Sequence, residues 1–280
     1  MSLTRRHVLG GIGFGLMAPA MVRAQAGSAH VVVVGGGFGG ATAARYLRRL
    51  NPDLRVTLIE PAQRFVTCPF SNMYLGGLRD WDSIGHGFDG LRAAGVEVVH
   101  ATADDVDTAA RTVRVGGDSI GYDRLILSPG IDIRWNALEG YDEAAAEIAP
   151  HAWKAGPQTQ LLKSQLEAMP DGGTFVMSIT DGAFRCPPGP YERASMVAHY
   201  LKTHKPASKI LLLDSKDSFS KQGLFQQGWD ALYGGMIEWI SQTDDGQVLS
   251  VDAAARQVET AFGTVHTADV LNIVPPQKAG

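Results

Sequence analysis

Short apolar runs alternate with segments of helical periodicity in the N-terminal half of the chain. Residues 30–34 are a histidine followed by four valines, residues 41–50 have a helical pattern, and residues 56–59 form a second apolar run that ends at Glu60. Apolar runs of this length between turn residues are typical of buried strands. This half therefore predicts a βαβ unit. Further strands are expected at 95–100, 111–115 and 122–127.

The same alternation continues beyond Tyr141. It predicts strands at 174–179 and 210–214, and helices at 161–169, 191–202 and 229–240. Two similar segments, Asp-Thr-Ala-Ala-Arg at 107–111 and Asp-Ala-Ala-Ala-Arg at 252–256, each lie between apolar runs. A repeat at the scale of a domain indicates two related domains rather than a solenoid. The predicted fold is α/β, with two tandem Rossmann-like, three-layer domains.

The first 26 residues predict an export signal. Arg5 and Arg6 precede an apolar run at 8–21, and Ala-Gln-Ala at 24–26 is a small-x-small cleavage site. The arginine pair resembles a twin-arginine signal, which exports proteins already folded; an ordinary secretory leader is the alternative. The apolar run is too short to span a bilayer. We therefore expect a periplasmic protein with no membrane span in the mature chain.

A glycine-rich turn at 35–40 joins the first strand to the first helix. Gly35 permits a tight turn, Gly37 lets the backbone approach a pyrophosphate, and Gly40 lets the helix pack closely on the strand. The helix N-terminus attracts phosphate, and Glu60 at the end of the second strand accepts hydrogen bonds from ribose hydroxyls. The candidate cofactor-binding residues of this unit are Gly35, Gly37, Phe38, Gly39, Gly40 and Glu60.

Two further segments favour FAD over NAD as the bound dinucleotide. Residues 122–130 resemble the strand and turn of FAD-binding reductases that carry Ala-Thr-Gly, with Ser128-Pro129-Gly130 in its place. Ala103 follows the predicted strand at 95–100, where that fold passes the adenine. Ser128, Gly130 and Ala103 are therefore added to the candidate FAD-binding residues.

The second unit has no comparable glycine turn. Its strand at 174–179 leads into residues 180–190, which contain three prolines and Asp181. The prolines leave no glycine cradle, and the carboxylate would repel a pyrophosphate. We expect this unit not to bind NAD(P)H. The expected domains are the N-terminal part of an FAD-binding domain at 27–140, a second Rossmann-like domain at 141–275, and the start of a return to the FAD domain at 276–280.

Composition excludes several other classes. Apolar residues make up 45% and charged residues 19%, as in ordinary globular proteins, and a net charge of -4 gives no reason to expect nucleic acid as a partner. The two cysteines are too few for a disulfide scaffold and lack CxxC spacing. The histidines show no close metal-ligand spacing, so no metal site is expected. Any thiol chemistry must rest on Cys68 and Cys186.

Three segments carry a specific resemblance. Residues 64–72, residues 186–194 (Cys-Pro-Pro-Gly-Pro-Tyr-Glu-Arg-Ala) and residues 214–222 resemble the flavoprotein subunit of flavocytochrome c sulfide dehydrogenase. That family belongs to the glutathione-reductase-like flavoproteins. The resemblance implies an FAD-dependent oxidoreductase that oxidises sulfide in the periplasm and passes electrons to a cytochrome c subunit carrying haem c.

The resemblance also implies roles for individual residues. Cys68 matches the cysteine that holds FAD covalently through a thioether; a small buried hydrophobic residue is the alternative. Cys186 matches one half of a redox-active disulfide, and Glu192 an active-site carboxylate that manages protons. Arg193 is expected to lower the pKa of the Cys186 thiol, unless it and Glu192 are only charges at the start of a helix. A disulfide between Cys68 and Cys186 is a further alternative, and would prevent the flavin thioether.

The chain departs from the family at its end. The expected returning strand, second redox cysteine and interface domain do not follow Gly280, so we expect a truncated chain with an incomplete FAD domain. Two rival functions stay open. One is a sulfide:quinone oxidoreductase or an NADH dehydrogenase-like flavoenzyme, and the other is a non-catalytic, flavin-binding remnant.

Overall fold

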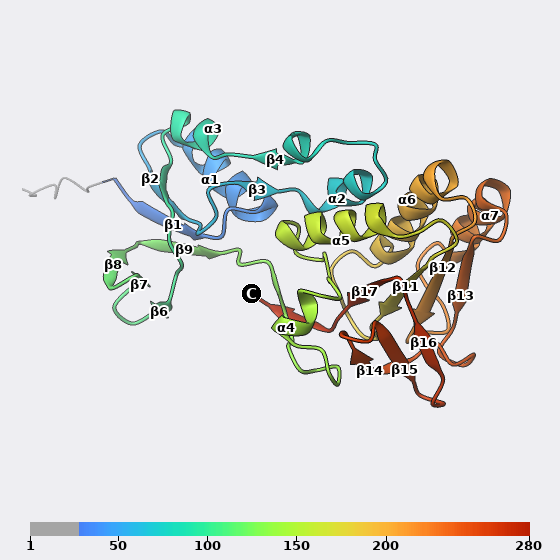
Figure 1. Ribbon diagram of the computed structural model, residues 1–280. Coiled ribbons are helices and arrows are strands. Elements are labelled where there is room, and N and C mark those ends of the chain that lie inside the picture. The colour runs from blue at the N-terminus through green and yellow to red at the C-terminus, as the bar shows by residue number, and fades with distance from the viewer. Residues whose placement is uncertain (1–27) are drawn as a thin grey trace, which may run out of the picture.

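Two parallel sheets form the centre of the molecule in the computed structural model, which describes residues 28–280 (Figure 1). The predicted export signal lies outside the described residues. The first sheet has the strand order β5-β2-β1-β9 and the second the order β13-β12-β11-β17. Their strands are β1 (His30–Val34), β2 (Arg55–Ile59), β5 (Glu97–Val99), β9 (Arg124–Leu127), β11 (Thr174–Ile179), β12 (Lys209–Asp214), β13 (Ile237–Ile240) and β17 (Val270–Val274).

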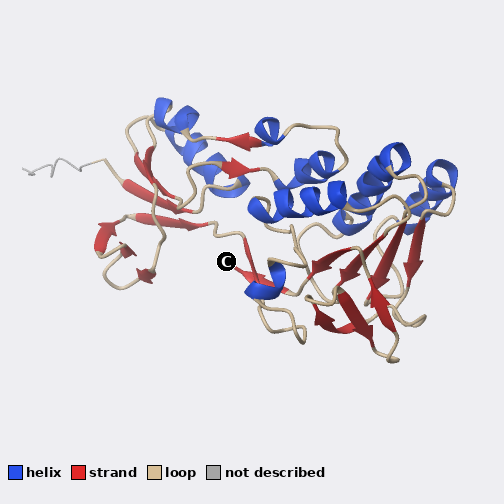
Figure 2. Ribbon diagram, viewed as in Figure 1, coloured by secondary structure: helices blue, strands red, loops and turns tan. Residues whose placement is uncertain are grey.

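Helices cover one side of the second sheet, and a small antiparallel sheet covers the other (Figure 2). This gives the three layers expected from the sequence. The helices are α1 (Phe38–Leu50), α2 (Cys68–Leu75), α3 (Asp89–Ala93), α4 (Glu143–Ala146), α5 (Pro157–Ala168), α6 (Gly189–His204) and α7 (Gln222–Tyr233), with a 3-10 turn at Trp81–Ile84. A short hairpin pairs β3 (Phe65–Val66) with β4 (Gly85–His86).

The internal repeat corresponds to a repeated structure. A three-stranded antiparallel meander precedes the last strand of each parallel sheet. One consists of β6 (Asp105–Asp107), β7 (Thr112–Val115) and β8 (Asp118–Gly121), and the other of β14 (Val248–Asp252), β15 (Gln257–Thr260) and β16 (Val265–Thr267). Arg111 and Arg256, which end the two similar segments, have φ values of 55° and 54° in equivalent turns. The two Rossmann-like units predicted from the sequence are therefore confirmed.

The strands are apolar on both faces because each sheet is covered on both sides. In β1, Val31 and Val33 pack in the cluster that includes Ala44 of α1, whereas Val32 packs with Val113 of the meander. Successive side chains of a strand point to opposite faces, so one valine run fills two cores.

The halves of the chain contact each other at helix α2 and at strand β18, among other places. Helix α2 belongs to the first half by sequence, but it packs against α5 and α6 of the second half. A Cβ added to Gly76, just after α2, would lie 3.1 Å from the carbonyl oxygen of Met196 in α6. Strand β18 (Gln277–Ala279) pairs antiparallel with β10 (Ile131–Ile133), which follows β9 closely in the chain.

The predicted helix at 229–240 is wrong. Helix α7 ends at Tyr233, and residues 237–240 form the edge strand β13. Gly234 and Gly235 have φ values of 56° and 80°, left-handed conformations that end the helix. Apolar periodicity alone cannot separate a short buried strand from a turn of helix, and the glycine pair is the signal that does so.

Candidate active site

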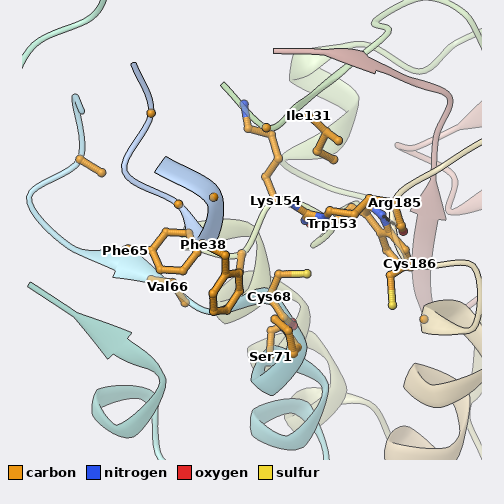
Figure 3. Close-up of a pocket in the computed structure, with 18 of the residues that line it drawn as sticks. Phe38, Phe65, Val66, Cys68, Ser71, Ile131, Trp153, Lys154, Arg185 and Cys186 are labelled. Carbon is orange, nitrogen blue, oxygen red and sulfur yellow. Dashed lines mark hydrogen bonds between the residues drawn. The ribbon is translucent and has the colours of Figure 1, made fainter. Parts of the chain in front are cut away.

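A cavity of about 700 Å³ lies where the two halves of the chain meet, and its size is that of sites for small molecules and cofactors. The glycine turn, the start of α2, the connecting segment 153–155 and the loop before α6 all contribute to its lining. Figure 3 shows side chains from these segments around one space. Of the predicted site residues, the lining includes Gly35, Gly37, Phe38, Gly39, Glu60, Cys68, Ser128, Gly130, Cys186 and Glu192.

At two positions of the glycine turn, a side chain would collide with backbone atoms. Gly35 has a φ of 96°, and a Cβ there would lie 2.1 Å from the carbonyl oxygen of Ser128. A Cβ on Gly40 would lie 1.8 Å from the carbonyl oxygen of Gly35, so helix α1 approaches the turn as closely as a glycine permits. Gly40 lies behind the cavity wall. The wall itself is therefore bare backbone at the N-terminus of a helix, which suits a phosphate.

Glu60 presents its carboxylate beside this turn. One oxygen accepts a hydrogen bond of 2.7 Å from the backbone N–H of Gly36, and the other accepts one of 2.9 Å from Ala62. A carboxylate oxygen has two acceptor sites, so both oxygens keep capacity for a ligand hydroxyl. The two backbone donors fix the carboxylate at the edge of the cavity.

Of the remaining residues predicted to contact FAD in the first unit, three line the cavity and one does not. Ser128 and Gly130 line the cavity, and Phe38 packs edge to face with Phe65 at a centroid distance of 5.2 Å (Figure 3). Ala103 is not part of the lining. It packs instead against the cluster that contains Val32, so its contact with an adenine stays a prediction.

Both cysteines lie at the cavity, one from each half of the chain (Figure 3). Cys68 is the first residue of α2, and Cys186 lies in the loop before α6. Cys186 has a φ of 63°, unusual for a residue with a side chain. Its carbonyl oxygen accepts a hydrogen bond of 2.8 Å from Gly189. Both thiols are free, so the alternative disulfide between them is not formed in the structure.

The Cys186 thiol is not activated in the way expected from the sequence. Burial raises its pKa, and the charges of Cys68 and Glu192 raise it further. The Gly189 N–H and the Arg185 guanidinium act in the opposite direction without reversing the shift. The net shift is therefore upward, although the attraction between Arg193 and Cys186, which raises the pKa of Arg193, acts in the expected direction on the thiol.

The buried side chain of Arg193 links its own helix, α6, to three other segments of the chain by hydrogen bonds. Its side chain is 2% exposed and donates to the side-chain oxygens of Asn72 and Asn272 and to the carbonyl oxygens of His151 and Ala152. Burial lowers its pKa to about 10, which leaves the guanidinium charged at neutral pH. A fixed positive charge thus lies beneath the cavity.

Several lining residues could not be identified from the sequence. The indole N–H of Trp153 donates to the carbonyl oxygen of Arg185 at 3.1 Å, and its ring lies against Gly189, where an added Cβ would be 2.9 Å away. Lys154 pairs with Asp132 at 3.0 Å. These residues reach the cavity by tertiary packing and carry no local motif. Asn72 had a usable signal, because it lies one helical turn after Cys68 on the same face of α2.

The matching edge of the second sheet is built differently. The cavity there is only about 160 Å³. Asp214 ends β12 as Glu60 follows β2, but it is fully buried. Its carboxylate accepts from the Tyr191 hydroxyl at 2.5 Å and the Trp239 indole at 3.0 Å, and pairs with Lys216 at 2.6 Å. Each of these three partners is a side chain of the second unit.

Within residues 28–280 no group of three or more histidine, cysteine, aspartate or glutamate side chains is arranged to hold a metal ion. Over the same residues, no helix has both the length and the apolar character needed to cross a bilayer.

The fold and the first-unit cradle fit a bound dinucleotide, and comparison with known proteins gives the class. Residues 29–166 match the family model described as pyridine nucleotide-disulphide oxidoreductase. The solved sulfide:quinone oxidoreductase of Aquifex aeolicus is similar over 89% of this chain, with a TM-score of 0.66 and 24% identity. Bacillus anthracis CoADR-RHD gives a TM-score of 0.68 at 18% identity over 90% of this chain. The chain therefore has the fold of this class of oxidoreductases, and the class implies FAD.

The second half and one relative identify the family. Residues 159–275 match the model of the central part of the sulfide dehydrogenase [flavocytochrome c] flavoprotein chain. The flavoprotein chain of this name from Chlorobaculum thiosulfatiphilum is 67% identical over 46 residues, which are 16% of this chain and 96% of that sequence. The chain belongs to the family of flavocytochrome c sulfide dehydrogenase flavoprotein chains, which are FAD-dependent oxidoreductases.

The longer relatives extend beyond the matched region. The sulfide-quinone reductase of Aquifex aeolicus (strain VF5) is 34% identical over 177 residues, which are 62% of this chain and 39% of that protein. The solved structures are covered to 58% for the Aquifex enzyme and 44% for CoADR-RHD. The chain thus spans between two fifths and three fifths of these longer proteins.

Proposed function

We propose that this chain carries the flavin and a redox-active thiol of a periplasmic sulfide dehydrogenase that passes electrons to a cytochrome c subunit. The observation that supports this most is the meeting of Cys68 and Cys186 at one cavity, beside the glycine turn and Glu60. FAD bound there would accept an electron pair from sulfide and release it one electron at a time. The backbone of the turn, Glu60, Ser128 and Gly130 would hold it.

We propose that Cys68 holds FAD through a thioether. Its thiol lines the cavity from the first residue of α2, and the glycine turn and Glu60 line the same cavity. Purified protein should then keep its yellow colour through acid precipitation, and a peptide containing Cys68 should carry the mass of FAD. Cys68→Ala should bind FAD only reversibly. Flavin released quantitatively from the wild type by acid would rule the thioether out.

We propose that Cys186 is one half of a disulfide whose other half is a cysteine that these 280 residues do not contain, because Cys68 would hold FAD, and that hydrosulfide attacks this disulfide. Attack would form a persulfide on one sulfur and release the other as a thiolate. Because the pKa of the Cys186 thiol is raised, a nearby proton acceptor is needed whenever this sulfur must become anionic. Glu192 lines the same cavity and is proposed as that group. Cys186→Ser should abolish sulfide oxidation, and Glu192→Gln should lower its rate by about 10²-fold or more.

We also propose that the second unit takes no NAD(P)H. The loop at 180–188 contains two prolines, the adjoining cavity is about 160 Å³, and Asp214 is fully buried and does not line that cavity. NADH should therefore not bleach the flavin, whereas sulfide should.

The electron acceptor has one specific rival. The Aquifex relative is named a sulfide-quinone reductase, so a quinone is the second candidate. Sulfide-dependent reduction of cytochrome c and of a soluble quinone should be measured in parallel on the protein with its native partner. Reduction of cytochrome c at the higher kcat/KM supports the proposal, whereas reduction of quinone alone contradicts it. A colourless protein that gains no flavin would favour the non-catalytic remnant.

Export is proposed from residues 1–26. Replacing Arg5 and Arg6 together by lysine should leave the protein in the cytoplasm if the twin-arginine route is used, and immunoblots of cell fractions measure this. Unchanged export of that variant would favour the ordinary secretory route.

A further inference from the structure

Arg193 is a buried cation without a direct carboxylate partner. Within the described residues no aspartate or glutamate forms a salt bridge with it, and its acceptors are two amide oxygens and two carbonyl oxygens. A buried charge is costly unless a charge of opposite sign compensates it. The Glu192 carboxylate compensates part of this charge without a direct contact, and the Trp153 ring centroid lies 4.9 Å from the guanidinium carbon. One neighbouring side chain connects Arg193 to that carboxylate by hydrogen bonds.

Asn72 is that neighbour. Its Oδ1 accepts a hydrogen bond of 3.1 Å from Nε of Arg193, and its Nδ2 donates one of 3.1 Å to Oε2 of Glu192. Nδ2 also lies 3.4 Å from the carbonyl oxygen of Gly189. A guanidinium can only donate, so Oδ1 must face Arg193 and the amide nitrogen must face Glu192. The amide therefore joins a cation to an anion in one fixed orientation.

This orientation distinguishes the two oxygens of Glu192. Oε2 must accept from Asn72, so it is the poorer place for a proton. Oε1 has no hydrogen-bond partner among residues 28–280 and belongs to a side chain that lines the cavity with Cys186. A proton exchanged with the site would therefore be carried on Oε1.

We infer that Asn72 is a positioning residue, which bridges the Arg193 guanidinium to Oε2 of Glu192 and so holds Oε1 as the proton-carrying oxygen beside Cys186. The inference rests on the proposed roles of Cys186 and Glu192. Asn72 comes from the half of the chain that carries the glycine turn, whereas Glu192 and Cys186 come from the other half. Docking of α2 on α6 thus completes the site.

The charges around the Cys186 thiol make the inference measurable. Cys68 on α2, Glu192 on α6 and Arg185 in the preceding loop act on it, and Arg193 and Lys154 lie at the same cavity. The Glu192 charge raises the pKa of this thiol. If Asn72 holds Glu192 in place, removing Asn72 lets the carboxylate turn away, and the pKa of Cys186 falls.

The test is a double-mutant cycle read by alkylation. The rate of iodoacetamide labelling at Cys186 is followed against pH in the full chain by peptide mass, which separates Cys186 from Cys68. Asn72→Ser and Glu192→Gln should each lower the apparent pKa of Cys186 by roughly half a unit or more, because a nearby like charge is moved or removed. The double variant should match Glu192→Gln alone, since Asn72 acts only through Glu192.

Asn272→Ser is the matched control. Asn272 is fully buried and also accepts from Arg193, at 3.0 Å, but it makes no hydrogen bond to Glu192. Its replacement should reduce stability and leave the Cys186 profile unchanged. If Asn72→Ser does not fold, Asn72→Gln replaces it in the cycle, because it keeps the amide but displaces it by one methylene.

Two outcomes would overturn the inference. One is a shift in Asn72→Ser that persists undiminished when Glu192 is glutamine, and the other is no shift while Glu192→Gln gives one. Labelling needs neither flavin nor sulfide. A cycle that behaves as expected in a protein that does not oxidise sulfide would leave the inference standing and reject only the proposed function.

Discussion

The two strand–turn–helix connections of this protein start from the same scaffold and end in different chemistry. In the first, residues 35–37 join β1 to α1, and the backbone lies open to the cavity. In the second, residues 180–188 join β11 to α6, and the longer connection brings Cys186 to that same cavity. The parallel sheets have the same strand order. The difference in function therefore lies in the connections, not in the sheets.

The acidic residues at the ends of β2 and β12 repeat this contrast. Glu60 is held by two backbone N–H groups and keeps free acceptor capacity at the cavity. Asp214 occupies the corresponding place but is fully buried among Tyr191, Trp239 and Lys216. One carboxylate is available to a ligand, and the other stabilises the fold.

The largest expected effect is a loss of stability that differs between the glycine turn at 35–40 and the connection at 180–188. Gly40→Ala forces a Cβ to within 1.8 Å of the Gly35 carbonyl oxygen, so helix α1 must move. We expect a loss of about 3 kcal/mol or more in unfolding free energy, and no retained FAD. Gly182→Ala is the control in the second connection. Gly182 has a φ of 72° but open space around it, so about 1 kcal/mol is expected, with FAD retained. Urea unfolding and the flavin-to-protein ratio measure both, and equal losses would contradict the contrast.

The next largest effect distinguishes the carboxylate of Asp214, which should matter for stability, from that of Glu60, which should matter for FAD binding. Asp214→Asn removes the charge that Lys216 and Tyr191 face in a buried site, so we expect a loss of about 2–3 kcal/mol in stability with FAD binding unchanged. Glu60→Gln should change stability by less than about 1 kcal/mol but weaken FAD roughly tenfold, measured in the Cys68→Ala background where binding is reversible. The opposite assignment, with Asp214→Asn weakening FAD, would show that the second unit also holds the cofactor.

A smaller effect concerns His151, in the connection between the two units. Burial, followed by the charges of Arg193 and Lys154, lowers its pKa to about 4 from 6.5. The unfolded chain therefore binds more protons between these values, and stability falls as the pH is lowered from 6.5 toward 4. Nδ1 also accepts from the backbone N–H of Trp153 at 2.9 Å, which a protonated ring could not do. Near pH 5 this residue should reduce stability by about 2 kcal/mol relative to pH 7, and His151→Gln should remove that part of the pH dependence. An unchanged slope in the variant would assign it to other groups.

The sequence was sufficient where structure is local. The valine run of β1, the glycine turn and Glu60 follow one another in the chain, so their pattern predicted both the elements and their place at the cavity. The repeat of residues 107–111 at 252–256 likewise predicted a second, related unit. The helix expected at 229–240 failed because its apolar spacing also fits a helix end followed by a strand.

The rest of the site depends on packing between distant segments. Asn72, Trp153 and Arg193 meet only because α2 docks on α6 and the connecting segment passes beneath the cavity. No spacing in the chain indicates such a meeting. The direction of the Cys186 pKa shift was missed for the same reason, because it depends on burial and on Cys68, which is far away in the sequence.

The central claim is that the first unit holds the flavin and the second supplies the sulfur that reduces it. The most direct measurement is the flavin absorbance of anaerobic protein after addition of sulfide or of NADH, in the wild type and in Cys186→Ser. We expect sulfide to bleach the wild type and not Cys186→Ser, and NADH to bleach neither. Bleaching of Cys186→Ser by sulfide at the wild-type rate, or bleaching by NADH, would contradict the claim.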